Sequence, residues 1–430
     1  MKTQIKRIAL GLLAAVIIVP LAIIAIQYTL DPGSSQKSAA AADHAQQIAT
    51  GEYLARAGNC IACHTVKYGA AYAGGRAVNT PFGKIYASNI TPDKDTGIGQ
   101  WTADDFWRAI HNGKGKDGRF LYPAFPYPNY TKVSRADADA IFAYLQTVKP
   151  VRQVNKEPEL RFPYNRRVLL AFWRTLYFKP GEFEAQPAQS AEWNRGAYLV
   201  QGLGHCSACH TNRNALGGTE ARADLAGGMI PMIDWYAASL TSDPASGLGK
   251  WSDQDVADLI HSGVSQRGAV YGPMAEVVYS STQHLTDADA KAMAAYIKTV
   301  PEHDPPEPAA TPPVEDAMVM MEQGARIYKK QCSACHEANG HGQPPAYPSL
   351  AGSRSLTAQS PVNPIRIVLN GGYPPSTAGN AQPYGMPPFA GTLNDDEVAA
   401  VVSFIRMSWG NNGGLVSPIE VARHRGVAEE

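Results

Sequence analysis

All six cysteines of this chain of 430 residues lie in Cys-x-x-Cys-His sequences. The motif occurs as CIACH at 60–64 and as CSACH at 206–210 and 332–336. A Cys-x-x-Cys pair alone also suits a redox disulfide or half of a zinc site, but a histidine directly after it is the attachment signature of c-type haem. The two cysteines form thioethers with the porphyrin, and the histidine binds the iron. The sequence therefore predicts three covalently bound haem c groups.

The predicted haem residues follow from the positions of these motifs. The covalent attachment points are Cys60, Cys63, Cys206, Cys209, Cys332 and Cys335. The expected iron ligands on one side of each haem are His64, His210 and His336. Zinc would need four ligands per ion, drawn from motifs far apart in the chain, so haem is the better interpretation.

A short proline-containing loop follows each motif at a similar distance, and two of these loops contain a methionine. Met274 lies in VYGPMAE at 270–276, and Met386 lies in YGMPPFA at 384–390. A single methionine is more often a core residue. Thioether sulfur is nevertheless a soft ligand, and a His and Met pair suits an electron-transferring haem. We therefore expect Met274 and Met386 to be the second iron ligands of the second and third haems.

The corresponding loop of the first unit reads LYPAFPY and presents Phe125, whose phenyl ring cannot bind a metal. The sequence has no methionine between Met1 and Met229. His111 is an alternative ligand, but His261 occupies the same place in the second unit, which has its own methionine. The sequence favours a first haem without a strong second ligand, walled by Phe125, with His111 as the weaker candidate.

Composition and motifs exclude two classes of function. The chain has 38 basic and 38 acidic residues, so its formal net charge is zero and the usual argument for a nucleic-acid partner is missing. No serine-histidine-aspartate set, phosphate loop or dinucleotide fingerprint is apparent. No catalytic residue is assigned, and the oxidation of a substrate is expected to occur on another chain.

The N-terminal sequence has an uncharged apolar run at 8–26. As a helix this run would be about 28 Å long, close to the apolar thickness of a bilayer. Lys2, Lys6 and Arg7 precede it, and the next basic residue is Lys37, which predicts that the rest of the chain lies outside the cytoplasm. A cleaved signal peptide is the alternative, but its apolar region is usually shorter. The favoured interpretation is a retained anchor in the inner membrane, with the haem domains in the periplasm.

The chain contains an internal duplication. GEYLARAGNCIACHT at 51–65 recurs as GAYLVQGLGHCSACHT at 196–211, and SNITPDKDTGIGQW at 88–101 recurs as SLTSDPASGLGKW at 239–251. A third unit, around GARIYKKQCSACHE at 324–337, is less similar. The sequence therefore predicts two copies of one unit followed by a shorter relative.

Capping residues mark the last helix of each unit. Ser134, Thr286 and Asn394 each stand three residues before an acidic residue and are followed by apolar residues at helical spacing. No stretch reads as a convincing strand. We expect an all-α fold, with three class I cytochrome c-like haem domains in tandem and an N-terminal transmembrane helix.

The expected boundaries follow from the repeats and from composition. They are a signal anchor or transmembrane helix at 1–30, a linker at 31–45, a first cytochrome c domain at 46–150, an interdomain segment at 151–191, a second domain at 192–301, a proline-rich linker at 302–316, a third domain at 317–411 and a C-terminal tail at 412–430. The interdomain segment includes RRVLLAFWRTLYF at 166–178, for which we expect a helix packed between domains.

The motifs NITPDKDTGIG, LYPAFPY, GAYLVQGLGHCSACHT, GPMAEVV and SFIRMSWGN, together with the haem motifs, resemble a known family. It comprises the tri-haem cytochrome c subunits of bacterial membrane-bound alcohol, gluconate and related sugar dehydrogenases. The resemblance covers about residues 46–411. The sequence YPAFPY is also similar to cytochrome subunits that accompany molybdenum hydroxylases, such as nicotinate or aldehyde dehydrogenases.

The resemblance implies an electron-transfer role. A separate large subunit, with pyrroloquinoline quinone, flavin or molybdenum, would oxidise the substrate in the periplasm, and this chain would pass the electrons to membrane ubiquinone. It also implies that His64, His210 and His336 are proximal ligands and that Met274 and Met386 are distal ligands. Two other functions remain open on the residues alone: a peroxidase-like haem enzyme with an open first haem, and a stand-alone electron carrier to an oxidase.

Overall fold

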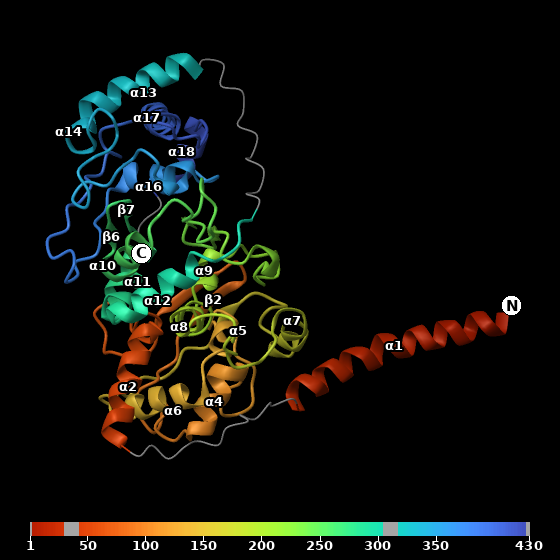
Figure 1. Ribbon diagram of the computed structural model, residues 1–430. Coiled ribbons are helices and arrows are strands. Elements are labelled where there is room, and N and C mark those ends of the chain that lie inside the picture. Colours follow the sequence, from red (N-terminus) through yellow and green to blue (C-terminus); the bar gives the residue numbers. More distant parts are fainter. Residues whose placement is uncertain (1, 30–42, 304–316, 427–430) are drawn as a thin grey trace.

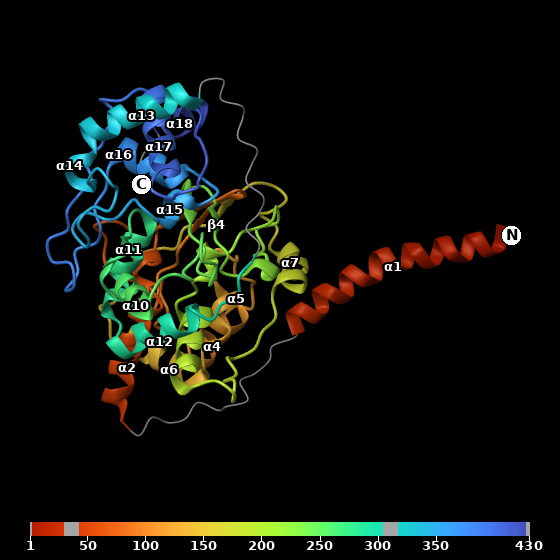
Figure 2. The same ribbon diagram turned by 45° about the horizontal axis from the view of Figure 1, so that its top comes forward.

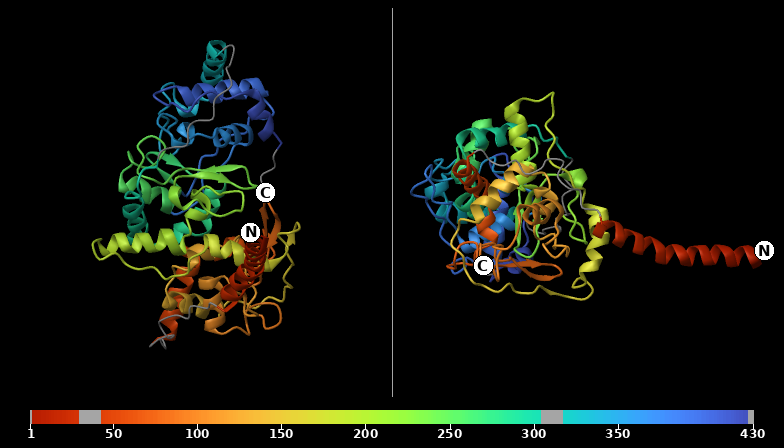
Figure 3. Two further views of the ribbon diagram at one scale, coloured as in Figure 1. Left: turned by 90° about the vertical axis from the view of Figure 1, so that its right-hand side faces the viewer. Right: turned by 90° about the horizontal axis from the view of Figure 1, so that it is seen from below.

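The computed structural model describes residues 2–29, 43–303 and 317–426. The three units that contain the haem motifs follow one another through the molecule, with the second unit between the first and the third (Figure 1). Figure 3 shows the same order from the side. The N-terminal helix α1 (Lys2–Thr29) projects away from these units and meets them at α7 (Leu170–Tyr177) (Figures 1 and 2).

Each unit is built from short helices joined by loops, with a few short strands. The first contains α2 (His44–Ala57), α3 (Cys60–Cys63), β1 (Ala77–Thr80), β2 (Gly83–Tyr86), α4 (Ala103–Asn112), α5 (Tyr127–Tyr130) and α6 (Arg135–Leu145). The segment after it contains β3 (Glu159–Leu160), η1 (Arg167–Leu169) and α7.

The second and third units repeat this plan. The second contains α8 (Ala191–Tyr198), η2 (Leu199–Leu203), α9 (Ser207–His210), η3 (Ala221–Ala223), β4 (Gly228–Ile230), β5 (Trp235–Ala237), α10 (Asp253–Ser262), β6 (Val264–Ser265), β7 (Gly268–Ala269), α11 (Pro273–Ser280), η4 (Thr282–His284) and α12 (Asp287–Ile297). The third contains α13 (Ala317–Gln331), α14 (Ser333–His336), α15 (Arg354–Thr357), α16 (Val362–Asn370), α17 (Asp395–Met407) and α18 (Pro418–His424).

In every unit the helix before the haem motif crosses a later helix of the same unit, α6, α12 or α17, at a glycine. A Cβ on Gly51 would lie 1.9 Å from the carbonyl oxygen of Ala140, and a Cβ on Gly196 would lie 1.8 Å from that of Ala292. At Gly324 the corresponding distance, to the carbonyl of Ala400, is 2.2 Å. The two backbones touch at each crossing, so only glycine fits there. These crossings fix the start of each haem motif against that later helix of its own unit.

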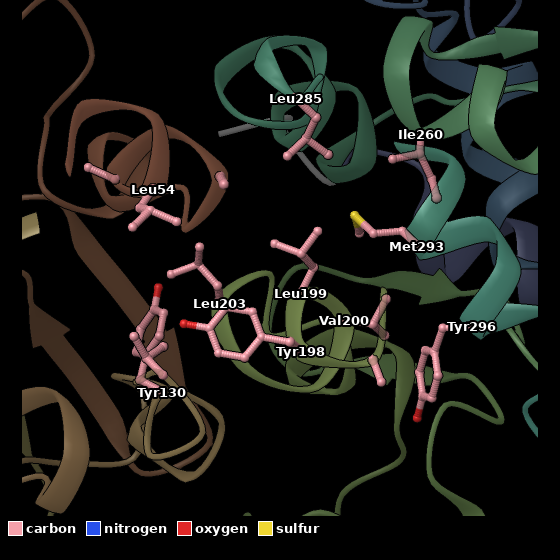
Figure 4. Packing of buried hydrophobic residues seen from close by; sticks show 14 of the residues in the cluster. Leu54, Tyr130, Tyr198, Leu199, Val200, Leu203, Ile260, Leu285, Met293 and Tyr296 are labelled. Atoms are coloured by element: carbon pink, nitrogen blue, oxygen red, sulfur yellow. The ribbon is translucent and has the colours of Figure 1, made fainter. Parts of the chain in front are cut away.

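The first two units share one hydrophobic core. Leu54 of α2 belongs to the same buried cluster as Leu199 and Leu203 of η2 and Met293 of α12 (Figure 4). The third unit has a separate cluster, which includes Ile365. Since apolar burial is the main stabilising term in folding, the first two units form one body, against which the third is packed.

The segment that contains α7 contacts both of the first two units. Arg174 donates to the carbonyl of Asn112 in the first unit over 2.5 Å, and the indole of Trp173 donates to the carbonyl of Leu216 in the second over 3.0 Å. This helix therefore contacts both of the first two units.

The expected all-α fold is wrong, because the structure contains short antiparallel strands. β1 pairs with β2 and β2 with β3, β4 pairs with β5, and β6 pairs with β7. These strands have two to four residues each. Strands this short show too few alternating positions to be recognised from a sequence.

The expected N-terminal transmembrane helix is also wrong. Among the described residues, none of the helices is long and apolar enough to cross a membrane. The end of α1 instead contacts protein: Gln27 hydrogen-bonds to Thr175 and Arg174 of α7, and Ile24 packs against the buried Phe120. An apolar run read alone does not reveal that its last turns meet protein.

Candidate haem sites

Each motif histidine is held by a hydrogen bond from its Nδ1 to a backbone carbonyl. The pairs are His64 with Ser88 at 2.7 Å, His210 with Ala238 at 2.6 Å and His336 with Pro348 at 3.1 Å. Ser88 and Ala238 hold corresponding positions in the duplicated sequence. A proton fixed on Nδ1 leaves Nε2 as the nitrogen that can bind iron.

The surroundings keep these imidazoles neutral, which is the form that binds a metal. Burial lowers the pKa of His64 and of His336, and the hydrogen bond to the carbonyl opposes it only in part. For His210, burial lowers the pKa to about 4. All three histidines are therefore prepared as ligands.

The six motif cysteines are free thiols, as haem attachment requires. The first cysteine of each pair is partly buried and the second is exposed. Burial raises the pKa of Cys60 and of Cys206 to about 12, so both stay protonated at neutral pH. A protonated thiol is a poor ligand for zinc, so these surroundings do not favour a zinc site.

A cavity of about 1690 Å³ surrounds the first motif. Cys60, Cys63 and His64 line it from the first unit, and Cys209 and Arg213 line it from the second. Apolar side chains of α4, α6 and α7 also line it, together with residues of the neighbouring strands and loops. An apolar pocket with attachment thiols and an oriented imidazole suits haem c, so the residues present fit this group.

The structure places Phe125, but not His111, in the first site. Phe125 lines the same cavity as His64 and packs against Tyr130, with ring centroids 5.3 Å apart. His111 is buried and stacks on Trp107 with centroids 4.2 Å apart, and it is not among the described residues that line the cavity.

Met274 is the second residue of α11, and this helix packs on the first haem motif. Arg76 donates to the carbonyl of Ala62 between the two cysteines over 2.6 Å, and to Oε2 of Glu276 over 3.0 Å. Ser280 donates to Oδ1 of Asn59 over 2.7 Å. The loop that presents the methionine of the second unit is thus anchored on the attachment site of the first.

Met386 is held by a short backbone bridge. Its N–H donates to the carbonyl of Gly372 over 2.9 Å, and its carbonyl accepts from the N–H of Gly372 over 3.0 Å. A Cβ on Gly371, whose φ is +69°, would lie 2.4 Å from the Met386 carbonyl oxygen. The side chain of Met386 packs against the core of the third unit, so the loop directs it inward.

Sequence reasoning missed His205, which lines the first cavity directly before Cys206. Its ring stands edge-on to Tyr130, with centroids 5.4 Å apart. His205 has a positive φ of 41°, and Asn59 has the same position in the first motif with a φ of 52°. The repeat contained a signal for this turn, because asparagine and histidine adopt a positive φ more readily than most residues and both stand directly before the first cysteine.

Comparison with known proteins agrees with this geometry. The cytochrome c family model matches residues 48–149, 194–301 and 321–409. The chain therefore belongs to the cytochrome c family, and its three motifs are the attachment sites of covalent haem c.

Its relatives include cytochrome subunits of dehydrogenases, which confirms the family resemblance. It is 38% identical over 393 residues to the cytochrome c subunit of the quinone alcohol dehydrogenase of Gluconacetobacter polyoxogenes, covering 88% of this chain and 84% of that one. It is 41% identical over 379 residues to the cytochrome c subunit of the gluconate 2-dehydrogenase of Pantoea cypripedii, covering 85% and 86%. It is 40% identical over 385 residues to one of the nicotinate dehydrogenase subunits of Pseudomonas putida, covering 87% of this chain and 31% of that one.

Proposed function

We propose that this chain is the electron-transferring cytochrome subunit of a dehydrogenase complex. The observation that supports this best is the arrangement of its sites. The cavity of the first haem motif is lined by Cys63 and also by Cys209 of the second, so the two attachment sites adjoin. The third unit packs on the second, with Asn363 and Tyr236 joined by two hydrogen bonds of 2.8 and 2.9 Å. Such an arrangement suits electrons that pass from site to site.

The residues of the chain have distinct roles in this proposal. Bound haem c supplies reversible one-electron chemistry. The six cysteines would attach the haem groups, and His64, His210 and His336 would be iron ligands. Met274 and Met386 would be the second ligands in the second and third sites, and Phe125 would line the first site without binding iron. Apolar walls exclude water, which lessens the reorganisation that each electron transfer requires. We propose domain limits of 46–150, 192–301 and 317–411 for the three haem units.

The proposed electron donor is a large dehydrogenase subunit of the alcohol-, sugar-acid- or aldehyde-oxidising kind. Relatives named for alcohol, gluconate and nicotinate dehydrogenases support this class. The proposed cofactor of the partner is pyrroloquinoline quinone, flavin or molybdenum. The proposed acceptor is ubiquinone in the membrane. The proposed location is the periplasmic face of the inner membrane.

Reconstitution tests this function. Protein matured with haem should contain three haems per chain and should be reduced by substrate only when the large subunit is present. Stopped-flow absorbance would follow haem reduction, and a large subunit without its cofactor serves as the control. Oxidation of an alcohol or aldehyde by this chain alone would contradict the proposal. Peroxide-driven oxidation of a reduced cytochrome, far faster than in the Phe125→Met variant, would instead favour a haem enzyme.

A further inference from the structure

One arginine of the third unit reaches into the second. Arg354, the first residue of α15, donates from Nη1 to the carbonyl of Ser239 over 2.7 Å. Its guanidinium lies over the buried ring of Trp251, 4.8 Å from the centroid. Three residues later, Thr357 donates to the carbonyl of Ala245 over 3.1 Å. This short helix therefore binds the loop of the second unit from outside that unit.

The loop that Arg354 binds is the loop that orients His210. The Nδ1 of His210 donates to the carbonyl of Ala238, the residue directly before Ser239. Two neighbouring carbonyls thus accept, one from the proximal histidine and the other from Arg354.

Arg354 differs from the other arginine at this interface in its partners. Within the part of the chain that the structure describes, this arginine makes no ion pair, although burial lowers its pKa to about 10. That value still leaves it charged at neutral pH. Arg366, which crosses the same interface, differs in that its Nη1 lies 3.6 Å from Oδ2 of Asp234.

In the first unit the residue that corresponds to Ser239 is held by neutral groups, and the cation near its loop, Arg152, is paired with Asp95 at 3.9 Å. Asn89 holds the position of Ser239, and its N–H donates to Oδ1 of Asn155 over 2.6 Å. Its Nδ2 donates to the carbonyl of Val151 over 2.7 Å. Among the described residues, a fixed charge that no carboxylate pairs is therefore a feature by which the second site differs from its duplicate.

We propose that Arg354 is a positioning residue for the second haem, because it fixes the loop that orients His210 and places a permanent positive charge beside it. This inference rests on the proposed function, in which His210 binds the second iron. Oxidised haem carries one more positive charge than reduced haem, so a fixed positive charge favours the reduced form. By analogy with the effect of one close charge on a pKa, we expect about a tenfold gain in the reduction equilibrium constant. For a one-electron couple this corresponds to ~59 mV.

Redox titration of the full chain with its three haems tests the inference. In Arg354→Gln the reduction equilibrium constant of one haem should fall about tenfold, while the other two change less than about twofold. Arg354→Lys keeps the charge and should stay close to wild type. Thr357→Val removes a neutral contact from the same helix and should also leave all three potentials in place. Arg354→Met is a second neutral variant if the Gln variant assembles poorly.

The haem whose potential shifts is identified with the Met274→Ala variant, which should alter the spectrum of the second haem. The inference is overturned if no reduction potential changes in Arg354→Gln, or if the potential that changes belongs to a haem whose spectrum Met274→Ala leaves unaltered. It is also overturned if Thr357→Val produces the same shift in potential. A Met274→Ala variant with three unaltered spectra would instead contradict the ligands assigned in the proposed function. In that case the Arg354 inference is still judged by whether a single couple moves.

Discussion

The hydroxyl of Tyr53 in the first unit donates to Oδ2 of Asp289 in the second over 2.5 Å. The reverse bond is also present, because Tyr198 of the second unit donates to Asp137 of the first. Tyr53 and Tyr198 hold corresponding positions in the repeat. The two units therefore face each other with the reciprocal contacts of a two-fold dimer, joined in one chain.

These bonds should contribute to stability. Tyr53→Phe leaves the Asp289 carboxylate without one partner, and we expect a loss of about 1–2 kcal/mol in the free energy of unfolding, with a similar loss for Tyr198→Phe. Denaturant unfolding followed by circular dichroism measures both. Tyr86→Phe is the matched control, since its hydroxyl donates to Glu159 over 2.7 Å at the surface. The interpretation fails if the Tyr86 variant is destabilised as much as the Tyr53 variant.

The same contact predicts a dependence on pH. Burial raises the pKa of Asp289, but hydrogen bonds from Arg195 and Tyr53 outweigh it and hold the pKa below its ordinary value. The folded state therefore favours the carboxylate. Its contribution to stability is fully present above about pH 4, the pKa of an unfolded aspartate, and is lost as the pH falls through the lower folded value.

Asp289→Asn should accordingly be less stable than wild type at neutral pH, and the difference should shrink as the medium becomes more acidic than about pH 4. Unfolding midpoints measured across this range test the prediction. Arg195 makes two bonds to the carboxylate, of 2.9 and 2.7 Å, so Arg195→Gln should also reduce the pH dependence. A difference between wild type and Asp289→Asn that is constant across the range would contradict this account.

The helix crossing at Gly196 should not tolerate a side chain. Alanine has the higher helix propensity by about 1 kcal/mol, but its Cβ would lie 1.8 Å from a backbone oxygen and would force the helices apart. We expect Gly196→Ala to destabilise the protein by about 1–3 kcal/mol or more. Thermal unfolding and haem content report this. Gly391→Ala, where an added Cβ meets nothing within 4 Å, should resemble wild type.

The first site should bind an external ligand. With Phe125 in the distal loop, the reduced protein should bind carbon monoxide at about one haem per chain. Phe125→Met should abolish carbon monoxide binding by supplying a thioether ligand, and Met274→Ala should allow a second haem to bind it. His111→Ala should leave the number of bound carbon monoxide molecules per chain unchanged. Absorbance titration with carbon monoxide gives the stoichiometry. If wild-type protein binds none and all three haems are low-spin, another side chain fills the first site.

Local features of this chain could be predicted from sequence, and contacts between distant segments could not. Ser134 and Thr286 accept from backbone N–H groups three residues on, and Asn394 forms a full capping box with Glu397, as expected. These signals lie within one helical turn. Arg354 and Ser239 are 115 residues apart, and no periodicity links them.

The contact between Arg354 and the second unit has a consequence for the protein in turnover. Thermodynamic linkage is reciprocal: if docking of the third unit makes the second haem easier to reduce, an electron on that haem must tighten the docking by the same factor. A factor of about ten corresponds to ~1.4 kcal/mol. The affinity of the third unit for the second would then be higher while the second haem is reduced and lower while it is oxidised. The stability of this interface would therefore depend on the redox state of the chain.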